Sequence, residues 1–136
     1  KKNIELEKII KKYNNQIKIF NGKYILKNKK DFKLKYKYLA FCGIGTPESF
    51  FDFLKINNIK VKEKLIYPDH YKYNKSDVEQ IVKIALDNKL EIITTEKDYK
   101  RLNVRNKKNI NQLKIKLNIK NINKFTKFLK KRLWKK

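Results

Sequence analysis

The 136-residue sequence lacks several residue types that would otherwise define its chemistry. It contains no methionine, one cysteine (Cys42) and one histidine (His70). A single cysteine excludes an intrachain disulfide and a cysteine-rich zinc site. No apolar run approaches the roughly 20 residues that cross a bilayer. Because a complete natural chain starts with methionine unless it is processed, we expect Lys1 to lie inside a longer protein, of which this is the C-terminal piece.

Acidic residues are also scarce, and the net charge is +24, from 37 lysines and arginines against 13 acidic residues. Two interpretations of this charge compete. One is an anionic partner, such as nucleic acid or a membrane surface. The other is a codon bias toward A and T, which also enriches asparagine and isoleucine. Under either interpretation the surface would attract anionic lipid. Arginine, which is preferred for phosphate recognition and base stacking, is rare and limited to Arg101, Arg105 and Arg132.

Strand-like and helix-like segments alternate along the sequence and predict an α/β fold. Residues 36–42 contain an unbroken apolar run, which is typical of a strand covered on both faces. Further strands are predicted at residues 59–67 and 89–95, with helices between them that begin near Thr46 and Ser76. Such alternation favours a three-layer, mainly parallel sheet with helices on both faces.

The sequence also indicates how these helices begin. Thr46 can cap the first helix, with Pro47 at its first position. Ser76 and Glu79 have the spacing of a capping box for the second. That second helix then carries a one-sided apolar stripe, Val78, Ile81, Val82, Ala85 and Leu86.

The flanking segments are less regular. Residues 1–35 are predicted to form a linking region with a short helix and a β-hairpin, because Asn21 and Gly22 separate two apolar segments. Residues 105–111 are predicted to be a loop, and residues 113–119 an edge strand. A last helix follows, with an apolar side that includes Trp134. We expect residues 36–136 to form one lobe.

Three polar loops follow the three predicted strands. In open α/β sheets, ligands bind beyond the carboxyl ends of the strands, so parallel strands would place all three loops at one edge. The loop after the second strand contains His70, the only side chain here that exchanges protons near neutrality when unperturbed. Asp69 could orient its imidazole or help to hold a cation. A surface or packing histidine is the alternative.

The other two loops each have two interpretations. Gly43 and Gly45 could bring backbone donors close to a phosphate or could form a tight turn. Glu48 occupies the third glycine position of a dinucleotide fingerprint, and no Gly-x-x-x-x-Gly-Lys-Ser/Thr loop is present. Residues 96–98 could serve as base, phosphate partner and metal ligand, or as a helix cap with a local ion pair. We expect no separate metal site. The predicted phosphate and substrate edge comprises Gly43, Gly45, Thr46, Glu96, Lys97 and Asp98.

Taken together, residues 40–51 (AFCGIGTPESFF), 67–70 (YPDH) and 94–98 (TTEKD) resemble the C-terminal part of the tetraacyldisaccharide 4'-kinase family. These enzymes phosphorylate the 4'-hydroxyl of a tetraacylated glucosamine disaccharide in lipid A biosynthesis. The three motifs occur in the family's order. Thr46 stands where the family usually has asparagine, and both residues can cap a helix.

The resemblance implies a two-lobed P-loop kinase at the cytoplasmic face of the bacterial inner membrane, attached peripherally. It implies ATP and Mg²⁺, bound mainly by an N-terminal lobe that this sequence lacks, so that the piece alone is inactive. It also implies that His70, with Asp69 in the Asp-His motif, works with an aspartate of the other lobe to activate the sugar hydroxyl. The alternatives are a degenerate inactive fragment or a basic nucleic-acid-binding module, which the shortage of arginine disfavours.

Overall fold

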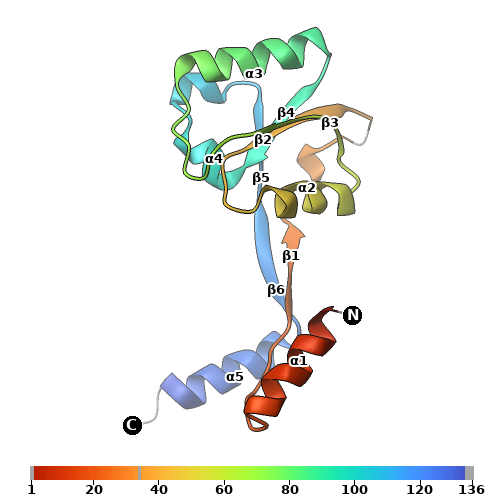
Figure 1. Ribbon diagram of the computed structural model, residues 1–136, viewed down its shortest axis with the longest axis vertical. Helices are drawn as coiled ribbons and strands as arrows, with labels where there is room; N and C mark the ends of the chain where they lie inside the picture. Colours follow the sequence, from red (N-terminus) through yellow and green to blue (C-terminus); the bar gives the residue numbers. More distant parts are fainter. Residues whose placement is uncertain (1, 34, 134–136) are drawn as a thin grey trace. The chain divides into compact units, whose positions relative to one another are not determined.

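A computed structural model describes residues 2–33 and 35–133 of the chain (Figure 1). They divide into two compact units. The larger unit is Leu26–Ile115, and the smaller combines the segments on either side of it, Lys1–Ile25 and Lys116–Lys136. Trp134, expected on the last helix, lies outside the described residues.

A four-stranded sheet forms the centre of the larger unit, in the order β3-β2-β4-β5. Each neighbouring pair is parallel, which confirms the predicted mainly parallel sheet. The central strand β2 lies between β3 and β4, and β5 is at one edge. The strands are β2 (Lys37–Cys42), β3 (Lys60–Ile66), β4 (Glu91–Thr95) and β5 (Ile110–Leu113).

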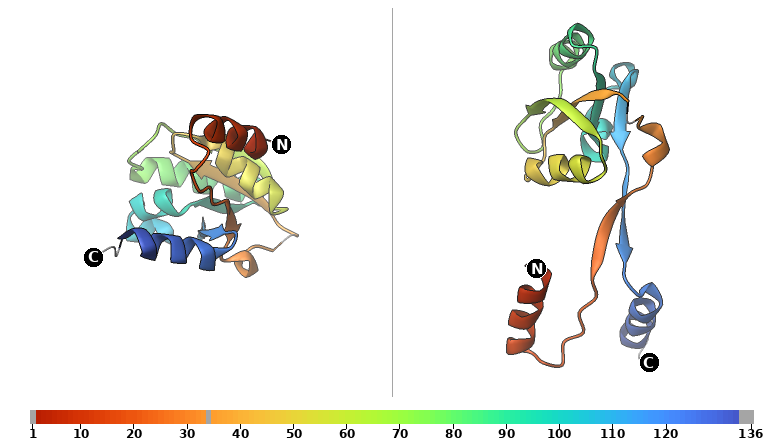
Figure 2. Two further views of the ribbon diagram at one scale, coloured as in Figure 1. Left: turned by 90° about the horizontal axis from the view of Figure 1, so that it is seen from below. Right: turned by 90° about the vertical axis from the view of Figure 1, so that its right-hand side faces the viewer.

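The side chains of β2 alternate between two hydrophobic cores, one on each face of the sheet. Tyr38, Ala40 and Cys42 belong to the core that contains Phe50, Phe51 and Leu54 of α2 (Pro47–Ile56). Leu39 and Phe41 belong to the core that contains Val78, Ile81 and Ala85 of α3 (Lys75–Asp87). The two helices lie on opposite faces of the sheet in Figures 1 and 2. The three-layer α/β class is therefore confirmed.

Cys42 is one of these core residues and is fully buried. Burial raises the pKa of its thiol to about 12, with smaller contributions from the carboxylates of Asp98 and Glu48. Since the thiolate is the reactive form of cysteine, Cys42 acts as a small apolar side chain at neutral pH.

The helix starts differ in detail from the prediction. Thr46 is the residue before α2, but its side chain makes no capping hydrogen bond. The capping box of α3 uses Asn74 and Asp77, two residues before the predicted pair. The Asn74 side chain accepts a hydrogen bond from the Asp77 backbone N–H, and the Asp77 carboxylate accepts one from the Asn74 N–H, at 2.9 and 2.8 Å. Asparagine caps helices as well as serine does, and α3 begins after the earlier of the two candidate caps, Asn74. Leu86, at the end of the predicted stripe, is exposed.

The smaller unit contains two helices, α1 (Lys2–Tyr13) and α5 (Ile122–Leu133). A two-stranded sheet of β1 (Gly22–Leu26) and β6 (Ile115–Ile119) extends from it. The strands are antiparallel, because backbone hydrogen bonds join Lys27 N to Lys114 O and Lys120 N to Asn21 O. An antiparallel pair is thus present, as expected.

The partner of β1 is not the one expected from the sequence. Residues 17–20 have no regular structure, and β1 pairs with β6, which follows the whole larger unit in the chain. Asn21, expected in a tight turn, instead donates from its side chain to Glu7 at 2.6 Å. The predicted single strand over residues 113–119 is in fact the end of β5 followed by β6.

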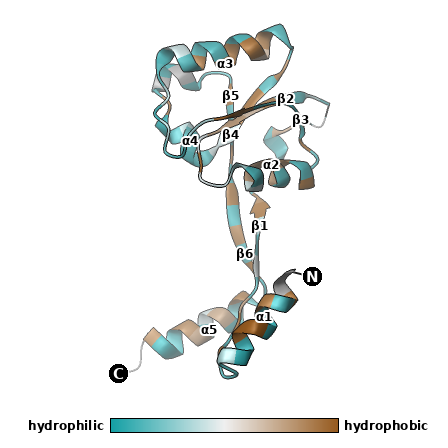
Figure 3. Cartoon of the chain, in the orientation of Figure 1, coloured by the Kyte–Doolittle hydropathy of each residue, from teal (hydrophilic) through white to brown (hydrophobic). Residues whose placement is uncertain are grey.

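None of residues 4–25 and 116–133 of the smaller unit is buried. Phe20 contacts Phe125 and Phe128 of α5, with ring centroids 5.2 and 5.4 Å apart. Ile4 and Leu6 of α1 are more than half exposed, and Figure 3 shows apolar residues along this helix and along β6. Within residues 2–33 and 35–133, no helix has the length and apolar character needed to span a bilayer.

Candidate functional site

The loops that follow β2 and β3 meet the helix that directly follows β4, at the carboxyl ends of these strands. His70 donates its backbone N–H to Gly43 O at 3.2 Å, which joins the second loop to the first. Arg101 is the last residue of α4 (Glu96–Arg101), the helix that follows β4. It donates from Nη1 to the same carbonyl oxygen at 2.9 Å, which joins this helix to the loop after β2. The three loops expected at one edge of the sheet are therefore in contact.

Two glycines allow this close approach. A Cβ atom at Gly43 would lie 2.9 Å from Pro68 O and 3.1 Å from the Tyr73 hydroxyl. A Cβ atom at Gly45 would lie 3.2 Å from Asp69 Oδ2. Neither glycine has a positive φ, so both are needed for space and not for an unusual backbone conformation. Gly43 in particular lets the loop after β3 lie directly against the end of β2.

We expect Gly43→Ala to lower the free energy of unfolding by about 1–3 kcal/mol, because a backbone carbonyl cannot rotate away from the added methyl group. Gly45→Ala is the matched control and should lose less, since its Cβ meets only the rotatable carboxylate of Asp69. Urea unfolding of both variants, followed by circular dichroism, measures the difference. Equal losses would contradict this account of Gly43.

His70 has a left-handed backbone conformation, with φ of 60°. This conformation is strained for a residue other than glycine and persists where several contacts enforce it, often at functional sites. Its N–H is shared between Gly43 O and Asp69 Oδ1, at 3.2 and 2.9 Å. The His70 side chain is 81% exposed, which excludes the packing role considered for it.

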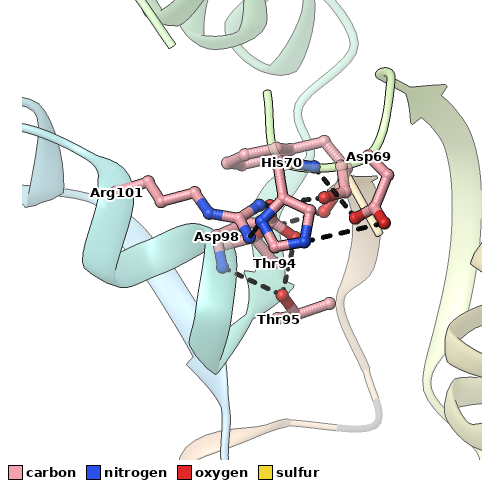
Figure 4. A network of polar contacts seen from close by, with 8 residues as sticks. Asp69, His70, Thr94, Thr95, Asp98 and Arg101 are labelled. Carbon is pink, nitrogen blue, oxygen red and sulfur yellow. Dashed lines mark hydrogen bonds and ion pairs between the residues drawn. The ribbon is translucent and has the colours of Figure 1, made fainter. Parts of the chain in front are cut away.

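A buried ion pair lies beside His70, and with the Thr95 cap it matches the helix cap and local ion pair given as one interpretation of residues 96–98. Asp98 is fully buried, and its Oδ1 accepts from Arg101 Nη1 at 3.0 Å. Its Oδ2 accepts from the Thr95 hydroxyl at 2.6 Å, and Thr95 Oγ1 in turn accepts from the Asp98 N–H as the cap of α4. The second terminal nitrogen of Arg101, Nη2, lies 3.1 Å from His70 Nδ1 (Figure 4).

The remaining predicted residues lie nearby but outside this network. Glu96 forms an ion pair with Lys100 at 3.5 Å, and Lys97 is exposed on α4. The Asp69 Oδ2 atom is 3.8 Å from His70 Nε2, too far for a hydrogen bond. The structure therefore brings together Gly43, Gly45, Asp69, His70 and Asp98, and leaves Thr46, Glu96 and Lys97 at the periphery.

Aromatic rings support the loop that carries His70. Tyr67, Tyr71 and Tyr73 contact one another, with centroids 4.9 to 5.2 Å apart, and Tyr73 also packs edge-on against Phe41. Burial raises the pKa of the Tyr73 hydroxyl, and the charge of Asp98 adds to this effect. Burial likewise raises the pKa of Tyr67. Both hydroxyls are therefore neutral at physiological pH, and the rings form a rigid apolar base for the loop.

The described part of the chain contains no group of three or more histidine, cysteine or acidic side chains that could hold a metal ion. Two surface hollows lie elsewhere, one along α3 and one between α2 and β3. Neither is lined by His70 or Arg101. The His70 side chain is exposed to solvent, whereas the Arg101 side chain is only 22% exposed.

Comparison with known proteins gives a consistent result. The family model described as tetraacyldisaccharide-1-P 4'-kinase matches residues 2–134. The chain is 43% identical over 116 residues to the tetraacyldisaccharide 4'-kinase of Pelagibacter ubique, covering 85% of this chain and 37% of that protein. It is 40% identical over 84 residues to the enzyme of the same name from Rickettsia felis, covering 62% and 26%. The chain thus spans only a minor part of these relatives. No solved structure matches.

Proposed function

The chain belongs to the tetraacyldisaccharide-1-P 4'-kinase family, and we propose that it is the C-terminal lobe of an enzyme that phosphorylates the 4'-hydroxyl of a tetraacyl disaccharide in lipid A biosynthesis. One observation carries this proposal beyond family membership. The first two motifs meet where Gly43 O accepts from the His70 backbone N–H, and Arg101, which binds both Gly43 O and Asp98, joins the third motif to them.

In the proposed reaction the 4'-oxygen attacks the γ-phosphorus of ATP, the bond from that phosphorus to the bridging oxygen of ADP breaks, and the hydroxyl proton passes to the aspartate of the N-terminal lobe with which His70 works. Phosphoryl transfer depends mainly on positioning and on neutralisation of charge. Mg²⁺, bound with ATP, would neutralise the phosphate charge. His70, held by Gly43 and Asp69, assists the departure of the proton. The remaining residues of the predicted edge, Thr46, Glu96, Lys97 and Asp98, would shape or support the surface that faces the substrate.

ATP and Mg²⁺ are assigned mainly to an N-terminal P-loop lobe, since this sequence contains no Gly-x-x-x-x-Gly-Lys-Ser/Thr loop. Residues 36–136 would belong to the C-terminal lobe. The smaller unit has apolar side chains, such as Ile4 and Leu6, that are more than half exposed, and these favour an interface with a further partner. Contiguous exposed apolar surface in a soluble domain usually marks an interface.

Peripheral attachment to the cytoplasmic face of the inner membrane is part of the same proposal. The net charge of +24 would attract anionic lipid. The basic residues of α5 extend along the whole helix: Lys124, Lys127, Lys130, Lys131 and Arg132. Nucleic acid is the less favoured anionic partner, because arginine is rare and Arg101 is engaged with Asp98.

The test is an assay of the protein that joins this chain to its native N-terminal lobe. Radioactive γ-labelled ATP and a tetraacyl disaccharide 1-phosphate are incubated with Mg²⁺, and the lipid product is separated by thin-layer chromatography. We expect label at the 4' position, none after chelation of Mg²⁺, and none with this chain alone. Transfer by this chain alone, or no transfer by the two-lobed protein, would overturn the proposal.

A further inference from the structure

The only histidine of the chain is in contact with an arginine. Arg101 Nη2 lies 3.1 Å from His70 Nδ1. A guanidinium group has five donors, no acceptor, and a charge that it keeps in proteins. Nδ1 must therefore be the acceptor in this contact. In a neutral imidazole one ring nitrogen accepts and the other carries the proton, so the proton of His70 lies on Nε2.

The position of Arg101 does not depend on His70. Its Nη1 donates to Gly43 O at 2.9 Å and to Asp98 Oδ1 at 3.0 Å. Asp98 is 0% exposed, and its other oxygen accepts from the Thr95 hydroxyl. The fork of the guanidinium thus has one arm anchored in the protein interior and the other directed at the imidazole, as Figure 4 shows. Such a preorganised fork loses little entropy when it forms a further hydrogen bond.

The other side of the imidazole favours the same tautomer. Asp69 Oδ2 lies 3.8 Å from Nε2, and Asp69 Oδ1 is held by the His70 backbone N–H at 2.9 Å. A carboxylate near Nε2 stabilises a proton on that nitrogen and has no such effect at Nδ1. The distance is too long for a hydrogen bond, so Nε2–H keeps its capacity to donate to another molecule. The 81% exposure of the side chain makes this nitrogen accessible.

We propose that Arg101 is a positioning residue that holds His70 as the neutral Nε2–H tautomer, so that the imidazole meets its partner at the active edge as a hydrogen-bond donor. The proposal rests on the proposed kinase function and refines the role of His70. While Arg101 occupies Nδ1, neither ring nitrogen is free to take up the proton of a hydroxyl group. His70 then assists through Nε2–H, by orienting an oxygen acceptor.

Nitrogen NMR tests this directly in the present chain. Because the sequence has one histidine, long-range proton–nitrogen correlations of a ¹⁵N-labelled sample report a single imidazole. Spectra are recorded over a series of pH values up to the point where the imidazole nitrogen shifts no longer change, so that the neutral ring is observed. A synthetic peptide with the sequence of residues 67–73 supplies the tautomer ratio without Arg101. We expect a larger Nε2–H fraction in the chain than in the peptide, approaching a single tautomer.

Three variants separate the contact from folding. Arg101→Lys keeps a cation beside Asp98 but has no fork, so it should fold and its tautomer ratio should relax toward that of the peptide. Arg101→Gln should relax in the same way and lose stability as well. Lys100→Gln is the matched control on α4, since Lys100 forms a surface ion pair with Glu96 and its side chain is 74% exposed. It should leave the ratio unchanged.

The NMR result stands apart from the kinase assay because it requires neither ATP nor lipid. A wild-type ratio equal to that of the peptide, a proton on Nδ1, or an unchanged ratio in Arg101→Lys would each overturn the proposal. If Arg101→Lys does not fold, the comparison of wild type with peptide decides alone. In the two-lobed protein, Arg101→Lys should lower kcat on the order of 10-fold with an unchanged KM for ATP.

Discussion

Replacing His70 by alanine in the two-lobed protein is expected to lower kcat for 4'-phosphorylation by roughly 10²- to 10³-fold, the loss typical of removing one positioned hydrogen-bond donor. The exposed imidazole projects from the edge where the three loops meet, and alanine removes both of its ring nitrogens. The ring does not support the core, so the loss should fall on turnover and not on folding. Initial rates at saturating ATP and lipid measure it, with KM for ATP as a check that the nucleotide site is intact.

Two further variants make this measurement specific. His70→Asn preserves the backbone, because asparagine tolerates a φ of 60° better than alanine does. It should fold like the wild type and lose as much activity as His70→Ala. Lys72→Ala removes an exposed cation two residues away and should retain wild-type kcat. Near-normal turnover in both His70 variants would remove the imidazole from the mechanism.

The largest expected effect on folding is at Asp98. Asp98→Ala should lower the free energy of unfolding by about 2–4 kcal/mol, since it leaves the Arg101 cation without its buried partner and the Thr95 hydroxyl without its acceptor. This is a large share of the roughly 5–15 kcal/mol that stabilises a typical domain. Urea unfolding of the chain, followed by circular dichroism, measures the change.

Glu96→Ala is the matched control for Asp98→Ala. It removes an acid from the same helix, but the ion pair of Glu96 with Lys100 is solvent-exposed and contributes about 0.5 kcal/mol or less. Asp98→Asn should fall between the two, because the amide keeps one oxygen acceptor. A loss for Asp98→Ala no greater than that for Glu96→Ala would show that the buried pair does not hold α4 against the strand ends.

The sequence was sufficient to predict the larger unit where the signals are local. The apolar run of β2 predicted a strand covered on both faces, and its side chains do enter two cores. Capping was less certain because Asn74 and Ser76 both suit a helix start and lie only two residues apart. The partner of β1 could not be predicted, since β6 is separated from it by the whole larger unit and the Asn21-Gly22 signal is local.

The location of the candidate site could be predicted from the topology of the sheet more than from individual residues. Parallel strands direct their following loops to one edge, so the approach of Asp69, His70 and the loop after β4 could be predicted. The role of Arg101 could not, because its contact with Gly43 depends on where the packing of α4 against β4 and β5 places the end of that helix. One signal was available: Arg101 is among only three arginines and lies three residues after Asp98, the spacing of a helical ion pair.

The chain enters and leaves the larger unit at adjacent points, where Lys27 N and Lys114 O are 2.8 Å apart. A segment whose two ends lie close together can be inserted into a surface turn of an unrelated host protein with little disturbance to the segment or to the host. We therefore expect residues 26–115 to fold as a unit after such a transfer. Chimaeras that exchange residues 26–115 between relatives, followed by urea unfolding, would test this expectation.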